Sequence, residues 1–519
     1  MRTIVGRHGH KPVPRAIALT TVLGVLFLTF LDTTIVTVVL GNIQFTLGAG
    51  IIPLQWVVNA YSLVFASLML FAGSLGDRLG RKRLMLIGIA VFCAGSVLCA
   101  LSPSIGWLIG GRAVMGVGAA ASEPGTLSVI RHMYPDRRRR ARALGAWAAV
   151  SGLSLAIGPV IGGLLVAVGD WRTVFWFNLA LGAALFVFAA EFVPLSRDPQ
   201  RGPLDGGGFV LGALALGSLI FAGMSGEQYG YRTSWVIVLF VVGAVAAAVA
   251  IAVERRVDSP IIDLRYLGQR SVADALFAAF AIYFGVFSIF FFTALYLDIV
   301  EGYSGLQMAQ MFGPMAGLIV AGSIVSGYWV GNAGPRGPMM SGAVVSAIGI
   351  LMTRVYLTPH PDFGALMLAL AIAGLGFGIA VVPVTAAVLG HVPAAHSGMA
   401  AGATNTARQL GSVVGVTALG ALVNVTITSG FGADLQRQGV PESLKNAVIG
   451  ILETGGSAAQ GLDIAHPDPS IAPLVHAATG AFRDGIHLAL IVSAVLILIS
   501  AVVTAATPRS ALDPESEVD

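Results

Sequence analysis

Charged residues are scarce in this chain of 519 residues. They make up 11% of the sequence, whereas an ordinary soluble domain has roughly 25%. Hydrophobic residues make up 56%, and the mean hydropathy is +0.84. This composition excludes a soluble globular protein and predicts an all-α polytopic membrane protein.

Cysteine and histidine are rare where metal or redox chemistry would need them. The only cysteines, Cys93 and Cys99, lie in one apolar run and offer neither a disulfide framework nor the spacing of a metal site. The nine histidines fall outside the apolar cores of the predicted spans or at their edges. A proton that crosses the membrane must therefore bind to carboxylates. No nucleophile–base cluster is visible, so we do not expect a membrane enzyme.

Fourteen apolar runs are long enough to cross a membrane, which takes about 20 residues. They cover residues 16–40, 53–75, 84–101, 105–130, 143–168, 172–193, 207–225, 234–253, 272–297, 309–331, 337–356, 364–390, 401–428 and 485–506. The first run is longer than the apolar core of a signal peptide, roughly 7–15 residues, and is interpreted as an uncleaved first span.

The basic residues predict the orientation of these spans. Most of the 30 lysines and arginines fall on the same side as the N-terminus, and positive loops face the cytoplasm. Both termini are therefore predicted to be cytoplasmic, in the inner membrane of the cell. The basic loop 131–143 could bind nucleic acid, but its place between spans is better explained as a topology anchor. We expect no nucleic-acid partner.

Residues 73–86 read GSLGDRLGRKRLML and lie between two apolar runs. Charges cannot stay in lipid, so this stretch must form a short cytoplasmic loop. Its candidate functional residues are Gly73, Asp77, Arg78, Gly80, Arg81 and Lys82.

Four motifs together resemble one family. They are the loop GSLGDRLGRK (73–82), LIGGRAVMGVGAA (108–120), GLSLAIGPVIGG (152–163) and LDTTIVTVVLGNI (31–43). The set resembles the major facilitator superfamily, in particular its fourteen-span drug:proton antiporters. The resemblance implies two six-helix bundles, residues 16–200 and 257–506, with two inserted spans in residues 201–256. The remaining parts are the N-terminus 1–15, a long outer loop 429–484 containing a short amphipathic helix at 443–455, and the tail 507–519, which we expect to be disordered.

The resemblance also implies roles for two of these motifs. The loop 73–86 would be a cytoplasmic latch, in which Asp77 and Arg81 contact a neighbouring helix end in the outward-facing state. A degenerate copy of the loop, with Arg336 but no aspartate, lies at residues 331–337. The motif at residues 152–163 resembles a signature of the family's antiporters, and we call it the antiporter motif. Its glycines would allow close helix packing and its proline would bend the span: Gly152, Gly158, Pro159, Gly162 and Gly163.

Asp32 and Arg112 are charged residues inside predicted spans. An ionised side chain there costs roughly 2.5–3.5 kcal/mol on insertion scales, so the protonation of Asp32 can be coupled to conformation. Each residue lies about 10–12 Å from the outer end of its span at the rise of an α-helix, so the two share a depth. The resemblance implies that their spans face each other. We expect Asp32 to carry protons with Arg112 as its partner; a structural ion pair is the alternative.

Glu123 departs from the family pattern, in which this position is usually apolar. It follows Arg112 by about three turns, on nearly the same face, and Pro124 after it cannot donate a backbone hydrogen bond. Glu123 is a candidate proton or cation site. The alternative is a residue that faces lipid headgroups or lies near a loop.

Several polar and aromatic residues are candidates for substrate binding, although packing in the core explains any single one equally well. Aromatic faces stack on flat drugs or attract cations. The quaternary-ammonium exporters of the family carry acidic residues where this chain has Asn405, so we do not expect dicationic substrates. The candidates are Asn59, Tyr61, Phe284, Phe287, Phe291, Asn405 and Arg408.

The predicted function is proton-coupled export of lipophilic, possibly cationic, drugs or antibiotics. We expect a monomer that contacts membrane lipids, uses no cofactor and draws energy from the proton gradient. A dedicated exporter of one natural product or lipid, and a symporter that imports a metabolite, are the alternatives. A sensor or scaffold would need neither intramembrane Asp32 nor Arg112.

Overall fold

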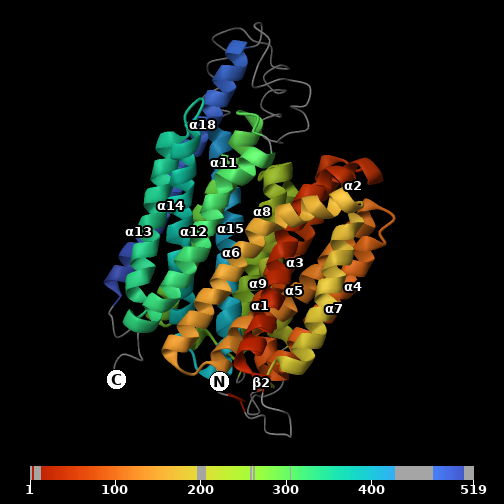
Figure 1. Ribbon diagram of the computed structural model, residues 1–519, viewed down its shortest axis with the longest axis vertical. Helices are drawn as coiled ribbons and strands as arrows, with labels where there is room; N and C mark the ends of the chain where they lie inside the picture. Colours follow the sequence, from red (N-terminus) through yellow and green to blue (C-terminus); the bar gives the residue numbers. More distant parts are fainter. Residues whose placement is uncertain are drawn as a thin grey trace.

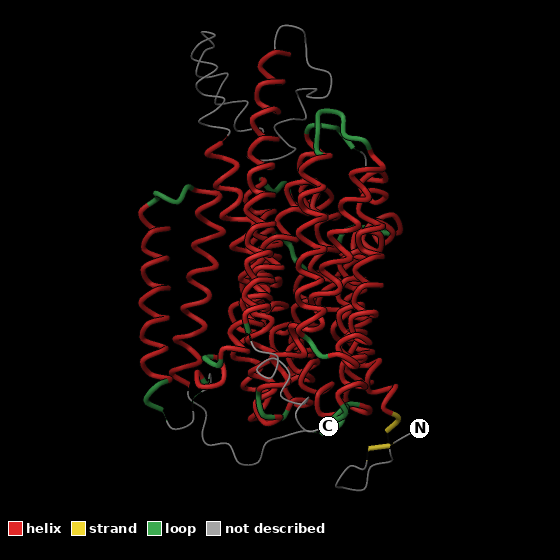
Figure 2. Tube along the Cα trace, turned by 90° about the vertical axis from the view of Figure 1, so that its left-hand side faces the viewer, coloured by secondary structure: helices red, strands yellow, loops and turns green. Residues whose placement is uncertain are grey.

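The structure is a computed structural model that describes residues 3–4, 13–195, 206–257, 260, 263–303, 305–426 and 472–507. Almost all of these residues are helical, and the helices run side by side along the long axis of the molecule (Figures 1 and 2). The N-terminal half contains α1 (Arg15–Ile35), η1 (Val36–Val39), α2 (Leu40–Leu47), α3 (Ile51–Leu79), α4 (Arg81–Ala100), α5 (Ile105–Met133), α6 (Arg137–Val168) and α7 (Arg172–Phe192).

Two helices follow the first half and lead to the second. They are α8 (Gly206–Tyr229) and α9 (Ser234–Glu254), which pack against each other, while α8 also contacts α3 and α15. The C-terminal half contains α10 (Leu264–Leu267), α11 (Arg270–Ile299), α12 (Gly305–Ala333), α13 (Arg336–Tyr356), α14 (Phe363–His391), η2 (Ala394–His396), α15 (Ser397–Thr426) and α18 (Ala472–Ala506).

The expectation of an all-α protein with fourteen spans is confirmed. In the described part of the chain, thirteen helices are long and apolar enough to cross a membrane, or fourteen if the bent helix α6 is counted. A pair of two-residue strands, β1 (Thr3–Ile4) and β2 (Val13–Pro14), precedes the first helix. Both termini lie at the lower end of the molecule (Figure 1). We call this end, which includes the turns at Gly80 and Pro135, the inner end.

Several helices are longer than the apolar runs that predicted them, because a helix can continue beyond the lipid. The largest difference is at α18, which begins at Ala472. The predicted outer loop extended to residue 484, whereas residues 472–484 belong to this helix. The predicted loop is therefore too long at its C-terminal end, because these residues are rich in alanine, which favours helix. The predicted short helix at 443–455 and the tail at 508–519 lie outside the described residues.

Close backbone contacts join the two halves at the inner end. Glycines make this approach possible: a Cβ atom added at Gly73 of α3 would overlap the carbonyl of Gly398 on α15. A Cβ added at Gly145 of α6 would meet the backbone of Ser323 and Gly327 on α12. The two halves are therefore in contact at the inner end through α3–α15 and α6–α12.

Helix α6 bends by 46° between its segments Arg137–Leu155 and Val160–Val168. Pro159 lies in the break between these two segments, where the bend was predicted, because proline removes a helical hydrogen bond. A Cβ added at Gly158 would overlap Thr34 of α1, and one at Gly162 would press on the carbonyl of Ile35. Gly152 likewise faces the side chain of Ile319.

The prediction of close packing is wrong for Gly163. A Cβ atom added at this position would have no other heavy atom within 4 Å. The side of α6 that carries Gly163 faces away from α1, so no neighbouring helix requires glycine there.

Candidate functional site

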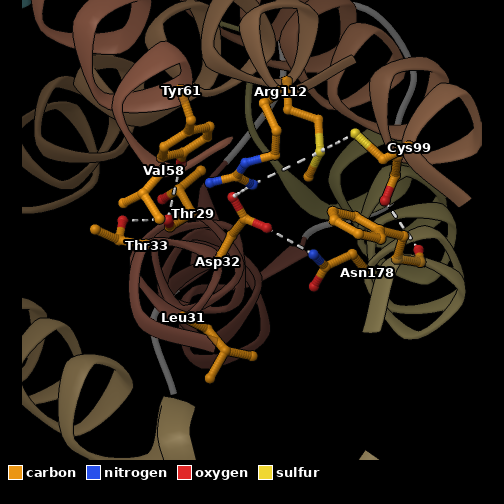
Figure 3. Close-up of polar contacts among 12 residues, drawn as sticks. Thr29, Leu31, Asp32, Thr33, Val58, Tyr61, Cys99, Arg112 and Asn178 are labelled. Carbon is orange, nitrogen blue, oxygen red and sulfur yellow. Dashed lines mark hydrogen bonds and ion pairs between the residues drawn. The ribbon is translucent and has the colours of Figure 1, made fainter. Parts of the chain in front are cut away.

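Asp32 of α1 and Arg112 of α5 form a buried ion pair (Figure 3). Nη1 of Arg112 lies 2.5 Å from Oδ2 of Asp32, and both side chains are 0% exposed. The predicted shared depth and the predicted pairing of these residues are therefore confirmed. Their role in proton transport stays a prediction.

The second oxygen of the Asp32 carboxylate also has a donor. Nδ2 of Asn178, on α7, donates to Oδ1 of Asp32 at 2.7 Å (Figure 3). We did not predict Asn178 from the sequence. It is a lone amide in the apolar string WRTVFWFNL at residues 171–179, and polar side chains within spans are a signal of function.

Arg112 is held from the side opposite Asp32 by helix α3. Its Nε donates to the carbonyl of Val57 at 2.9 Å, and its guanidinium lies 4.5 Å from the centre of the Tyr61 ring. The hydroxyl of Tyr61 donates to the carbonyl of Thr29 at 2.9 Å. Tyr61 therefore connects α3 to α1 beside the pair, and its predicted role in substrate binding stays a prediction.

Glu123 lies in a second buried polar cluster, which joins the two halves of the molecule. Nδ2 of Asn405, on α15, donates to Oε2 of Glu123 at 2.6 Å. Nη1 of Arg408 donates to Oδ1 of the same asparagine at 2.9 Å. Glu123 is 0% exposed, so the alternative placement near headgroups or a loop is wrong. Helix α5 continues through Pro124 without ending.

The prediction of a loop over residues 73–86 is wrong in its extent: these residues are the end of α3 and the start of α4, with only the turn at Gly80 between them, because a helix can continue beyond the lipid. This stretch, which we continue to call the loop 73–86, connects α3 to the start of α15. Both carboxylate oxygens of Asp77 accept the backbone N–H of Gly398, at 2.9 and 2.8 Å, and Oδ2 also accepts that of Met399. Arg81 donates to Asp77 at 3.0 Å and to the carbonyl of Ala394 at 2.7 Å. A carboxylate at a helix N-terminus is stabilised by the helix dipole and by unpaired N–H groups. The predicted contact with a neighbouring helix end is confirmed.

Other residues of the loop extend this connection. Nη2 of Arg78 donates to the carbonyl of Pro260 at 2.9 Å, and Gly80 has a φ of 102°, which favours glycine at the turn between α3 and α4. Nearby, hydrogen bonds from Arg265 lower the pKa of Asp263, whose backbone N–H points at the sulfur of Met399. Lys82 lies half-buried at the start of α4.

Comparison with known proteins gives the family. Residues 22–416 match the sequence profile of the Major Facilitator Superfamily. The chain belongs to the Major Facilitator Superfamily.

Two relatives in this superfamily are similar over most of their length. The multidrug resistance protein Stp of Mycobacterium tuberculosis (strain CDC 1551 / Oshkosh) is 32% identical over 476 residues, which cover 90% of this chain and 87% of Stp. The multidrug efflux pump LfrA of Mycolicibacterium smegmatis is 33% identical over 452 residues, covering 86% of this chain and 87% of LfrA. The solved structure of the human organic anion transporter MFSD10 shares the fold, with a TM-score of 0.65 at 14% identity, covering 95% of this chain and 100% of that one.

The aromatic side chains predicted to bind substrate do not form one cluster in this superfamily member. The ring of Phe287 on α11 stacks on Tyr283 at 5.3 Å, and both rings contact Phe377 of α14. Phe284 lies against Phe280 instead. Phe291 is 42% exposed, with its ring against Phe292.

The remaining polar candidates differ in their surroundings. Asn59 is half-buried on α3, whereas Asn405 and Arg408 are 3% and 4% exposed. Sequence reasoning missed Trp147 of α6 and Thr385 of α14, whose contacts with Arg408 complete the second cluster. A single tryptophan or threonine in an apolar span carries little signal, because core packing and lipid contact select the same residues.

Proposed function

We propose that this protein is a proton-coupled antiporter that exports lipophilic drugs or antibiotics by alternating access. It would lie in the cytoplasmic membrane with both termini in the cytoplasm, act as a monomer surrounded by lipid, and use the proton gradient without a cofactor. Relatives named as a multidrug resistance protein and a multidrug efflux pump, each covering most of the chain, support the substrate class. The observation that carries the proposal is the buried ion pair of Asp32 and Arg112, which lies among helices α1, α5 and α7.

The pair gives a physical route from protonation to movement. Removing one partner of a buried ion pair leaves the other uncompensated and costs about 3–5 kcal/mol. When a proton neutralises Asp32, Arg112 loses its counter-charge, so the packing of α1, α5 and α7 around the pair is no longer favoured. Protonation therefore shifts the balance between two conformations, as antiport requires.

Two further elements would take part in this cycle. Glu123 would be a second proton-sensitive carboxylate, since it lies at the contact between the halves. The latch of Asp77 and Arg81 on α15 would hold the inner end closed, and its release would admit substrate from the cytoplasm. The bend and the close packing of α6 on α1 would give the antiporter motif its hinge.

The substitution Asp32→Asn tests the proposal. We expect proton-driven efflux of a lipophilic test compound from proteoliposomes to be lost, while expression and energy-independent exchange remain, because asparagine keeps the size but cannot release a proton. Asp274→Asn is a matched control: Asp274 is 4% exposed, accepts a hydrogen bond from Thr504 at 3.1 Å and lies outside the site. Wild-type efflux in Asp32→Asn, or inward co-transport of proton and substrate, would overturn the proposal.

A further inference from the structure

Arg408 is a buried cation with neutral partners. Its nitrogens donate to Oδ1 of Asn405 at 2.9 Å, to the hydroxyl of Thr385 and to the carbonyl of Val381 at 3.4 Å. Its Nε has no hydrogen-bond partner. Among the described residues, no carboxylate lies within 4.0 Å of the guanidinium. An isolated buried charge is costly, so this site favours an anion.

The surroundings of Arg408 are aromatic and come from both halves. The guanidinium lies 5.1 Å from the ring centre of Trp147 on α6 and 5.6 Å from that of Tyr283 on α11. Tyr283 continues into the stacked rings of Phe287 and Phe377. Flat rings beside a cation suit a planar aromatic molecule that carries an acidic group.

Glu123 is the nearest negative group, and it belongs to the other half. Its Oε2 reaches Arg408 only through the amide of Asn405, and its Oε1 has no hydrogen-bond partner. If the halves part at the inner end, Glu123 moves with α5 while Asn405 and Arg408 move with α15. The guanidinium then loses the negative charge to which Asn405 connects it.

We propose that Arg408 binds the carboxylate of a planar aromatic substrate, which takes the place of Glu123 when the inner end opens. Arg408 is thus a specificity-determining residue, and the preferred cargo is an aromatic anion. In secondary transporters built from internal repeats, the substrate site lies at the interface between the repeats. Arg408 lies at the corresponding place, the contact between the two halves of this molecule. This inference rests on the proposed export function and adds the charge of the substrate to it.

A matched set of probes tests the preference. Binding of 2-naphthoate, 2-naphthamide and 2-naphthylmethylammonium to the purified full-length protein is measured by competition and calorimetry. We expect 2-naphthoate to bind about tenfold or more tightly than the other two, because a charged hydrogen-bonded contact is worth a factor of this order. Equal or tighter binding of the ammonium or the amide, or no measurable binding of 2-naphthoate, would overturn the inference.

Variants of the cluster test the residue itself. Arg408→Gln should abolish the preference, so that 2-naphthoate binds no more tightly than 2-naphthamide. Arg408→Lys should retain part of the preference, since lysine keeps the charge but not the planar fork. Arg142→Gln is the control for loss of one positive charge and should leave the preference unchanged, because Arg142 is exposed and lies over the ring of Tyr328 at 4.8 Å, away from the cluster. A preference that survives Arg408→Gln would contradict the assignment.

Glu123→Gln tests the exchange of carboxylates. Removal of the competing negative charge should tighten binding of 2-naphthoate, and weaker binding would contradict the exchange.

Failure of the inference is distinguishable from failure of the export function. If neutral or cationic compounds leave proteoliposomes in a manner that needs Asp32 but not Arg408, export stands and the inference falls.

Discussion

The carboxylate of Asp32 has one charged and one neutral donor, Arg112 and Asn178. The charged donor sets the energy of the ion pair, and the amide fixes the direction of the second oxygen. Because the side chains of Asp32 and Arg112 are 0% exposed, water cannot replace a donor that is removed. The protonation of Asp32 should therefore depend on Asn178 as well as on Arg112.

At the scale of the residue, the substitution Asn178→Ala tests this dependence. A hydrogen bond to a charged group contributes about 1.5–3 kcal/mol, so we expect proton-driven efflux to fall about tenfold or more. Its dependence on pH should change as well, while energy-independent exchange continues. The measurement is efflux from proteoliposomes over a range of external pH. Asn424→Ala, at an exposed position of α15, is the control, and an unchanged pH profile in Asn178→Ala would contradict the role of the amide.

Sequence reasoning at this scale found the charged residues but not their full surroundings. Asp32, Arg112 and Glu123 were visible because a charge inside an apolar run is costly and needs a reason. Asn178 and Trp147 were not singled out, because an amide or an indole in a span costs far less and its partner lies on another helix. The amide that completes the pair is 146 residues away from Asp32 along the chain.

At the scale of the element, two glycines of the antiporter motif make a matched pair of tests. A methyl group at Gly158 would overlap Thr34, whereas one at Gly163 would meet no other atom. Overpacking typically costs about 1–3 kcal/mol, so Gly158→Ala should lower the thermal midpoint in detergent. Gly163→Ala should leave it unchanged or raise it, since alanine is favoured over glycine in a helix by about 1 kcal/mol.

Both variants are compared by thermal unfolding of the purified protein and by efflux. If Gly163→Ala were as destabilising as Gly158→Ala, the packing of α6 on α1 would differ from the one described. The motif by itself indicated close packing at every glycine. Which glycines a neighbour actually approaches depends on how α6 is rotated, and periodicity in a uniformly apolar helix does not encode that rotation.

At the scale of the whole molecule, the contacts between the halves include the latch of Asp77 on α15 and the glycine contacts of α6 with α12. Asp77 is 1% exposed, and its hydrogen bonds to Gly398 and Met399 hold the end of α3 against the start of α15. Charged hydrogen bonds of this kind contribute about 1.5–3 kcal/mol each. Their loss should therefore shift the population toward a state that is open at the inner end.

The substitution Asp77→Asn tests the latch. In a background with Cys93 and Cys99 replaced by serine, a cysteine introduced at Ser323 of α12 reports the opening, because this position is 1% exposed and its backbone carbonyl lies close to Gly145 of α6. We expect thiol labelling from the inner side to rise several-fold in Asp77→Asn. Asp136→Asn is the control, because Asp136 caps its own helix at the same end and accepts from the N–H of Arg139 at 2.8 Å. Equal labelling in the two variants would show that Asp77 does not hold the inner end closed.

The sequence by itself determined the number of spans and the presence of charges within them. These are local properties, because the cost of placing a segment in lipid depends on the residues of that segment alone. Tertiary structure decided which charges meet. Glu123 lies on the same helix as Arg112, but its partner is Asn405, 282 residues away along the chain, because α5 and α15 pack against each other. Helix packing alone places Asp32 and Arg112 in a buried ion pair. It also leaves Glu123 and Arg408 connected only through the amide of Asn405.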